Sequence, residues 1–356
     1  MEPDALTARE LALAPPHAHG SPPASGVLRA EPEDFVVEED LGFEPAGTGQ
    51  HLLLKVRKRS ANTQWVAREL ARLAHCRIAE VGYAGLKDRH AVAVQWFTVP
   101  RPRAAVDWHG TGQAQFAVLE AHPHTRKLPR GALAGNRFVV RIRAPDGDGA
   151  GLAAALAPRL ALIATRGVPN YFGPQRFGRD AGNLARAAGE LRSLRPEERG
   201  LVLSAARSVI FNAVLAARVR DGSWEHLLAG DLANLDGRGS VFPVVQTDAA
   251  LAGRCQRLEI HPTGPLWGEG VPESRGAVCE RELRIAQEFA AHAALCAAAG
   301  MRQERRSLRL AARELGCEGE AAGVVLRFRL PRGCFATAVL RELVAAVAPH
   351  PADSNT

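Results

Sequence analysis

Lysine is scarce in this sequence. The 356 residues contain 45 Lys and Arg together, yet only four of them are Lys, at Lys55, Lys58, Lys87 and Lys127. The two side chains differ in shape, hydration and ease of deprotonation. A position that keeps Lys in a chain so rich in Arg is therefore a candidate for a special role.

Disulfide, zinc and membrane signals are also missing. The six cysteines form no C-x-x-C pair, and none lies at zinc-site spacing from a His. His122 and His124 have no Cys or carboxylate partner at a useful spacing, so we expect no metal site. No apolar run approaches the roughly 18 residues of a membrane span, and the N-terminus is acidic without an apolar segment. We therefore expect a cytoplasmic monomer with reduced thiols and no membrane contact.

Positive charge is in excess. The 45 basic residues exceed the 38 acidic ones by seven. A basic chain favours a polyanionic partner, and nucleic acid is the first candidate. A GC-rich genome, which inflates Arg and Ala, would produce the same composition. Charge alone therefore leaves nucleic-acid binding open.

The length suggests two domains, or one domain with a large insertion. Residues 1–25 and 349–356 lack apolar periodicity and are expected to be flexible tails. The strand near residues 324–330 resembles the early strands, so we expect it to rejoin their sheet and make the helix-rich middle an insertion. Strands are predicted at 34–38, 51–56, 81–85, 92–99, 137–143 and 324–330, and helices at 62–73, 152–165, 201–220, 280–299 and 335–347.

Two of these strands alternate arginine with apolar residues. Alternate residues of a strand share a face, so each strand has one arginine-bearing face. This pattern is typical of a half-buried sheet whose solvent face is charged. A cationic face laid against phosphates is the alternative. The arginines concerned are Arg137, Arg141, Arg327 and Arg329.

The segment from Gly82 to Ala91 carries the strongest chemical signal. Two glycines bracket a strand end, and Lys87 and Asp88 follow side by side. Strand ends project side chains at a sheet edge, where active sites often lie. Cations on both sides favour the charged form of Asp88, which could act as a nucleophile or a general base. A solvated surface turn is the alternative interpretation.

Aromatic residues occur beside polar ones at three further places. Asn136 and Phe138 are two apart on a strand, so they could hydrogen-bond and stack a flipped base; a turn Asn before a core Phe is the alternative. Residues 167–178 interleave Gly, Pro, aromatics and Arg, as nucleic-acid contacts and domain hinges both do. Phe35 and Phe335 fit a core position, and Phe335 also fits the sheet edge.

Seven segments, taken in order, resemble the TruD family of tRNA pseudouridine synthases. The resemblance covers roughly residues 28–345, and seven motifs in the family's order leave little room for chance. The motifs are E-D-F-V-V-E at 33–38, G-L-K-D-R-H-A at 85–91, G-N-R-F at 135–138, V-P-N-Y-F-G-P-Q-R-F-G at 168–178, L-S-A-A-R-S at 203–208, G-R-G-S at 237–240 and F-A-T-A-V-L-R-E-L at 335–343.

The resemblance implies an α/β (α+β) fold. Its catalytic domain would have the pseudouridine-synthase sheet, mixed and largely antiparallel, in residues 26–162 and 301–348. A TRUD insertion domain would occupy residues 163–300. The implied activity is isomerisation of uridine to pseudouridine in tRNA, at position 13 in the bacterial members.

The resemblance also implies roles for single residues. Uracil must leave the ribose at N1 and rejoin it through C5, with no redox change, so no cofactor is needed. Asp88 could attack C1′, add to C6 of the base, or abstract a ribose proton to form a glycal, and the sequence does not choose among these routes. By position in the motifs, the nucleophile is Asp88, its electrostatic support is Lys87, and the substrate-binding residues are Phe35, Asn136, Phe138 and Phe335.

Three alternatives remain open. An inactive RNA-binding protein on the same fold would keep the charge but make no product. A metal-dependent nuclease would need a second carboxylate beside Asp88, and Asp34 is the nearby motif candidate. An enzyme of the same class with a broader range of RNA substrates would share every motif.

Overall fold

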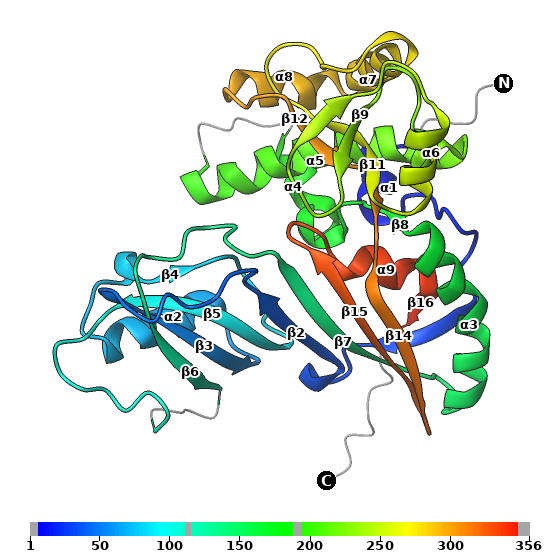
Figure 1. Ribbon diagram of the computed structural model, residues 1–356. Coiled ribbons are helices and arrows are strands. Elements are labelled where there is room, and N and C mark those ends of the chain that lie inside the picture. Colours follow the sequence, from blue (N-terminus) through cyan, green and yellow to red (C-terminus); the bar gives the residue numbers. More distant parts are fainter. Residues whose placement is uncertain (1–5, 111–114, 188–193, 348–356) are drawn as a thin grey trace. The chain divides into compact units, whose positions relative to one another are not determined.

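The computed structural model describes residues 6–110, 115–187 and 194–347 (Figure 1). The chain divides into two compact units. Unit 1 comprises residues 1–22, 159–312 and 334–343, and unit 2 comprises residues 23–158, 313–333 and 344–356. Each unit has a hydrophobic core of its own.

Unit 2 is built on a ten-stranded sheet. Two of its strand pairs, β1–β16 and β2–β5, are parallel and the others are antiparallel. The mixed, largely antiparallel sheet expected from the sequence is therefore present. Its main path is β14 (Arg313–Glu320), β15 (Gly323–Pro331), β7 (Gly135–Arg143), β2 (Phe35–Asp40), β5 (Val92–Pro100), β3 (His51–Arg59) and β6 (Phe116–His124), with β1 (Ala24–Leu28), β4 (Gly82–Tyr83) and β16 (Val344–Val347) at its sides.

The late strand rejoins the early ones as predicted. β15 pairs with β7 along nine residues, from Gly323 opposite Arg143 to Pro331 opposite Gly135. Residues some 180 positions apart in sequence are thus hydrogen-bonded neighbours in one sheet. The helix-rich middle of the chain is an excursion from this sheet.

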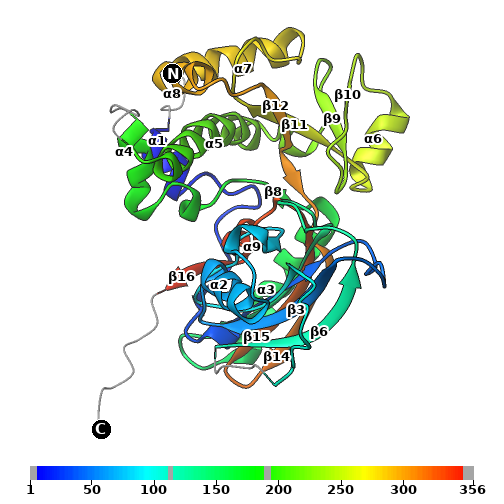
Figure 2. The ribbon, with the colours of Figure 1, turned by 90° about the vertical axis from the view of Figure 1, so that its left-hand side faces the viewer.

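One face of the sheet is covered by α2 (Thr63–Leu73), as Figure 2 shows. The helix begins at the expected Asn62, whose side chain accepts a hydrogen bond from the Gln64 amide. Val66 and Leu70 are fully buried against β3, β5 and β6. The i, i+4 apolar spacing read from the sequence is what places this stripe on the sheet. Short 3-10 helices, η1 (Pro32–Asp34) and η2 (Ile78–Glu80), precede β2 and β4.

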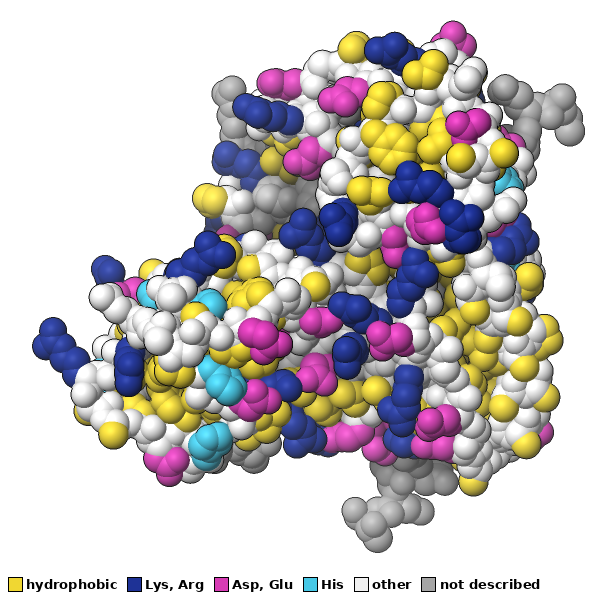
Figure 3. Space-filling model, viewed as in Figure 1, with side chains coloured by type: hydrophobic (Ala, Val, Ile, Leu, Met, Phe, Trp, Pro, Cys, Tyr) yellow, Lys and Arg dark blue, Asp and Glu magenta, His cyan; other side chains and the backbone are white. Residues whose placement is uncertain are grey.

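The opposite face of the sheet carries the alternating arginines. Three of them contact carboxylates of the same sheet: Arg141 with Glu320 at 2.7 Å, Arg327 with Glu318 at 3.3 Å and Arg329 with Asp40 at 2.5 Å. Arg141 also lies 3.7 Å from the buried Asp34 of η1. Dark blue and magenta side chains are accordingly interspersed over the sheet in Figure 3. The half-buried sheet with a charged solvent face describes this surface better than an open cationic platform.

Unit 1 is organised around the long helix α5 (Pro196–Arg220; Figure 2). The residues in the middle of α5, from Ser208 to Ala216, are buried. By length and composition α5 could cross a membrane, but 67% of its most apolar window is buried in this core. The helices of the unit are α1 (Ala8–Leu13), the end of α3 (Gly149–Arg166), α4 (Gly182–Ala187), α6 (Ala249–Gln256), α7 (Gly276–Glu288), α8 (Ala290–Ala298) and α9 (Ala336–Leu343), with the 3-10 turns η3 (Pro174–Arg176), η4 (Arg179–Ala181) and η6 (Ser223–Glu225).

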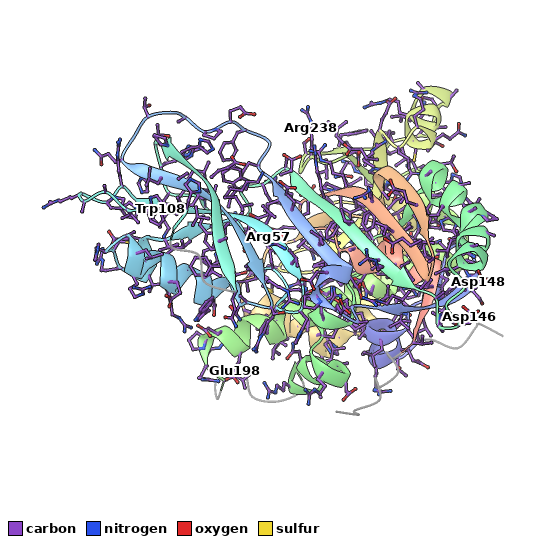
Figure 4. All side chains as sticks on the ribbon, turned by 90° about the horizontal axis from the view of Figure 1, so that it is seen from below. Arg57, Trp108, Asp146, Asp148, Glu198 and Arg238 are labelled. Atoms are coloured by element: carbon purple, nitrogen blue, oxygen red, sulfur yellow. The ribbon has the colours of Figure 1, made fainter. Side chains whose placement is uncertain are left out.

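Unit 1 also holds two small sheets. The four-stranded one runs β10 (Val241–Pro243), β9 (Leu232–Leu235), β11 (Ile260–Leu266) and β12 (Glu304–Ser307). The two-stranded one pairs β8 (Val168–Pro169) with β13 (Arg309–Leu310). The G-R-G-S motif forms the turn between β9 and β10, and Arg238 of this turn is exposed (Figure 4).

Residues 6–25 differ from the flexible tail expected for residues 1–25, and residues 1–5 lie outside the described residues. Thr7 and Glu10 form a reciprocal capping box on α1, and Leu11 is 2% exposed. Asn212 of α5 donates to the Leu11 carbonyl at 3.0 Å. A helix of six residues is too short to show periodicity, and its order depends on the core that receives it. The tail expected at 349–356 lies outside the described residues.

Two helices end earlier than the sequence suggested. The helix expected at 280–299 is divided at Phe289 into α7 and α8. The one expected at 335–347 ends at Leu343, and Val344 begins β16 instead. β1 supplies a strand partner for residues 344–347, and this pairing overrides the local helical pattern. Residues 301–312 and 334–343 belong to unit 1, whereas the motifs grouped them with the catalytic domain.

Candidate active site

Asp88 lies in the loop of residues 84–91, which joins β4 to β5 in unit 2. The loop starts where β4 passes very close to its neighbours: a Cβ on Gly82 would lie 2.4 Å from Thr98 Oγ1 and 2.6 Å from the Leu128 carbonyl. Only glycine fits at this position. The tight passage fixes the point from which the loop departs.

Uncharged side chains beneath the loop hold its first half. Gln95 of β5 donates to the Gly85 carbonyl at 2.6 Å, and the Lys87 amide donates to Thr63 Oγ1 at 3.1 Å. Thr63 in turn donates to Gln95 Oε1 at 3.1 Å, and both side chains are fully buried. Buried polar groups that are mutually satisfied give a unique, rigid arrangement.

A buried lysine holds the second half. Lys58 of β3 donates from Nζ to the Asp88 carbonyl at 2.8 Å and to the Ala61 carbonyl at 2.8 Å. Its side chain is 0% exposed. Burial lowers the pKa of Lys58 to about 8, against the opposing effect of the nearby Asp88 charge.

The Asp88 carboxylate itself faces outward. It is 52% exposed, and Arg29 contacts its Oδ2 at 2.9 Å. Arg29 follows β1 in a left-handed conformation, at φ 57°, and its guanidinium lies 4.2 Å from the centre of the Phe35 ring. The ion pair uses one carboxylate oxygen and leaves Oδ1 outside it.

Lys87 points away from the carboxylate it was expected to support. Its Nζ lies 2.7 Å from Glu39 Oε1, and the two side chains are 10% and 0% exposed. Lys87 thus enters the interior, whereas the next residue, Asp88, meets solvent. The cation in contact with the Asp88 carboxylate is Arg29. That Lys87 supports the Asp88 carboxylate electrostatically stays a prediction. If it does so, it acts while its ammonium is in contact with Glu39.

Glu39 is held from two sides. Its second oxygen, Oε2, accepts from the Trp96 amide at 2.9 Å. Asn136 stands directly opposite Glu39 in the β2–β7 ladder, so their side chains share the face covered by α2. The Asn136 side chain is 8% exposed, and its Oδ1 has no hydrogen-bond partner in the described structure.

Phe138 belongs to an aromatic cluster on the same face. Its ring stacks on Phe328 with centroids 5.2 Å apart and meets the edge of Phe35 at 5.9 Å. Phe138 is 6% exposed and Phe35 is 4% exposed. Both rings therefore contribute to the core, and only a small part of each is open to a ligand.

Five of the six expected site residues are thus linked in unit 2. Phe335 belongs to unit 1, where its ring lies 6.1 Å from Phe172. The guanidinium groups of Arg176 and Arg306 lie 5.7 and 5.9 Å from its centre. The V-P-N-Y-F-G motif therefore supplies, through Phe172, the packing of Phe335.

Asp34, the second carboxylate that a nuclease would need, is already engaged. Arg143 binds it through two hydrogen bonds of 2.9 Å. Burial opposes ionisation, but the contacts with Arg143 and the Glu31 amide hold the pKa of Asp34 below its usual value. Among residues 6–110, 115–187 and 194–347, no three His, Cys, Asp or Glu residues gather as metal ligands would. Asp34 gives the nuclease alternative no support.

The arrangement presents one exposed carboxylate on a loop whose main chain is held at Gly85, Lys87 and Asp88. Arg29 balances the charge of this carboxylate. The buried amide oxygen of Asn136 and the aromatic cluster around Phe138 lie together on the sheet face covered by α2. Such a site can attack or deprotonate a planar, uncharged substrate while it holds the substrate by a hydrogen bond.

Sequence reasoning did not assign Arg29, Glu39 or Lys58 to this site. The sequence did contain a signal for Lys58, because this residue shares the buried face of β3 with Leu54 and Val56. Lysine on a buried strand face is unusual. Arg29 carried no signal, since its contact depends on a positive φ in an ordinary residue.

Comparisons with known proteins agree with these motifs. The family model described as tRNA pseudouridine synthase D (TruD) matches residues 15–191 and 181–343. The protein named tRNA pseudouridine synthase D from Xanthomonas euvesicatoria is 46% identical over 350 residues, which span 92% of this chain and 94% of that protein. The protein of the same name from Methylococcus capsulatus is 46% identical over 338 residues, with the same coverage.

A solved structure has the same fold. The crystal structure of the putative tRNA pseudouridine synthase D from Methanosarcina mazei superposes with a TM-score of 0.72 at 21% identity, over 94% of this chain and 97% of that one. The motifs, the fold and the relatives lead to one conclusion. The chain belongs to the TruD family of tRNA pseudouridine synthases.

Proposed function

We propose that this chain isomerises uridine to pseudouridine in tRNA, at position 13, with Asp88 as the nucleophile. The observation that carries the proposal is the placement of Asp88. Its carboxylate is half exposed, while the main chain on both sides of it is tied to buried groups. Fixed position with free access is what a reacting group needs.

The reaction breaks the bond between C1′ and N1 and forms a bond between C1′ and C5. The proton on C5 is lost to solvent, and N1 gains one, so atoms and electrons balance without a cofactor. An ionised Asp88 serves each of the three routes, since attack at C1′, addition to C6 and abstraction of a ribose proton all need a carboxylate. Arg29 balances its charge from one side only.

Uracil would be held by Asn136. The buried Oδ1 of this residue has no hydrogen-bond partner in the described structure. A buried acceptor without a hydrogen bond costs free energy. The N3–H group of uracil is a donor of the matching kind. Phe138 and Phe35 would form an apolar wall beside the base, which offsets part of the few kcal/mol needed to unstack it.

The direct test uses purified protein and an unmodified tRNA labelled with tritium at C5. Release of tritium, together with sequencing-based mapping of the modified position, reports both the reaction and its site. Product at position 13 is the expected result. Binding of tRNA without tritium release would favour the inactive RNA-binding alternative, and product in other RNAs would favour the broader range. We further propose a cytoplasmic monomer, which gel filtration and fractionation of cells would test.

A further inference from the structure

Lys58 is the most deeply buried charged group that contacts the loop of Asp88. It lies on β3 between two exposed arginines, Arg57 and Arg59, and Arg57 is labelled in Figure 4. Successive strand residues point to opposite faces, so Lys58 enters the interior beneath α2. Taking an ammonium out of water costs free energy. A buried lysine therefore needs hydrogen-bond acceptors in the interior that offset this cost.

Those contacts join two turns of the chain. Nζ binds the Ala61 carbonyl, which precedes α2, and the Asp88 carbonyl, which is 30 residues after Lys58 in sequence. Gln95 and Thr63 hold Gly85 and Lys87 of the same loop, but neither of them reaches Asp88 itself. Lys58 is the side chain that fixes the main chain of the nucleophile.

The charge of Lys58 also acts on the site. The charged groups that influence it are Asp88 and Lys87 of the loop and Glu39 of β2. Burial leaves the pKa of Lys58 at about 8, so the ammonium loses its charge in a range where a protein can be assayed. A neutral amine still has two N–H donors, one for each carbonyl. Raising the pH therefore removes the charge and keeps the anchor.

We propose that Lys58 is a positioning residue for the reaction of Asp88: it holds the Asp88 carbonyl, and its positive charge favours the Asp88 carboxylate. The proposal rests on the proposed function, because it assumes that Asp88 is the nucleophile. It assigns Lys58 no contact with tRNA, since the side chain is fully buried.

The kinetic test compares Lys58→Met with two controls. Lys127→Met removes an exposed lysine that also donates to a main-chain carbonyl, that of Ala79, and should leave the rate unchanged. Thr63→Val removes an uncharged anchor of the same loop. We expect Lys58→Met to lower kcat on the order of tenfold with KM within about twofold, as for a group that acts only on the chemical step. Unchanged kcat in Lys58→Met would overturn the proposal.

The pH dependence separates anchor from charge. Between about pH 7 and about pH 9 wild type loses the charge of Lys58, so its advantage over Lys58→Met should shrink. The advantage of wild type over Thr63→Val should stay constant, because both proteins contain Lys58. An advantage over Lys58→Met that does not change with pH would mean that the charge plays no part.

A third measurement needs neither catalysis nor a stable Lys58 variant. With lysine labelled at Cε, NMR shows four lysines, of which one should titrate near pH 8. Asp88→Asn removes a negative charge that raises the pKa of Lys58, so that midpoint should move down. If Asp88→Asn left the titration midpoint of Lys58 unchanged, the proposal would be overturned even if the enzyme is active. An inactive wild type with the expected shift would instead reject the proposed function and leave the Lys58–Asp88 coupling intact.

Discussion

The two faces of the sheet in unit 2 use charge in opposite ways. On the solvent face, arginines of β7 and β15 meet carboxylates of the same sheet and remain partly exposed. On the face under α2, three charged side chains that the structure describes, Lys58, Lys87 and Glu39, are almost fully buried. The first face has many charges with small individual effects. On the second face, these three charges are each joined to the loop of Asp88.

The difference shows where electrostatics matters in this molecule. An exposed ion pair contributes little because water screens it and because its side chains lose freedom. A buried charge interacts more strongly, and removal of its partner leaves an uncompensated ion in the interior. Function should therefore be sensitive to single charges on the α2 face and tolerant of changes on the other.

The largest effect should follow from Asp88→Asn. This change removes the proposed nucleophile and keeps its shape, so pseudouridine formation should vanish. Affinity for tRNA should stay within a few-fold, because it comes from many phosphate contacts. Tritium release and a filter-binding titration measure the two quantities. Turnover above about a tenth of wild type would remove Asp88 from its role.

Breaking the buried pair should be next in size. Lys87→Met leaves Glu39 charged and unpaired, which costs about 3–5 kcal/mol of unfolding free energy. Adding Glu39→Gln should recover much of this loss in denaturant titrations. Lys87→Arg keeps the charge but brings a planar fork into a space that is filled by an ammonium, and kcat should fall on the order of tenfold. Wild-type stability of Lys87→Met and wild-type kcat of Lys87→Arg would show that the Lys87–Glu39 pair is dispensable.

Phe138 tests whether the α2 face is core or binding surface. Phe138→Ala opens a cavity between Phe35 and Phe328 and should cost about 3–5 kcal/mol of stability. Phe138→Leu fills most of the space and should restore most of that stability. If the ring also stacks on the flipped base, Phe138→Leu should still lose activity, by up to about 1–3 kcal/mol in the barrier. A stable and fully active Phe138→Leu variant would show that Phe138 acts only as a core residue.

The smallest effect is expected on the arginine face. Arg327→Gln should change stability by less than about 1 kcal/mol, because its partner Glu318 is exposed. Arg141→Gln should have a similarly small effect, because Glu320 is exposed and the buried Asp34 keeps its two hydrogen bonds from Arg143. Binding of wild type to tRNA should weaken steeply between about 50 and 200 mM salt. The slope should be unchanged in these variants, since their charges are balanced by Glu318 and Glu320. A flatter slope in either variant would show that the face does contact phosphates.

Local pattern was sufficient for most elements and for the motif that contains Asp88. Apolar periodicity predicted α2 and its cap at Asn62, and alternation predicted β7 and β15 as half-buried strands. Recognition of seven ordered motifs predicted the family. Each of these depends on residues close together in sequence, where spacing translates directly into a shared face.

What the sequence by itself determined is the family of the chain and the kind of sheet that carries Asp88. Tertiary structure decided which cation meets Asp88, which carboxylate meets Lys87, and that a second lysine, Lys58, holds the loop. It also decided that residues 8–13 are helical and that residues 344–347 are a strand. The reason is the same in every case: these outcomes depend on partners that lie far away along the chain. Their contacts exist only after the strands have paired and the interior has excluded water.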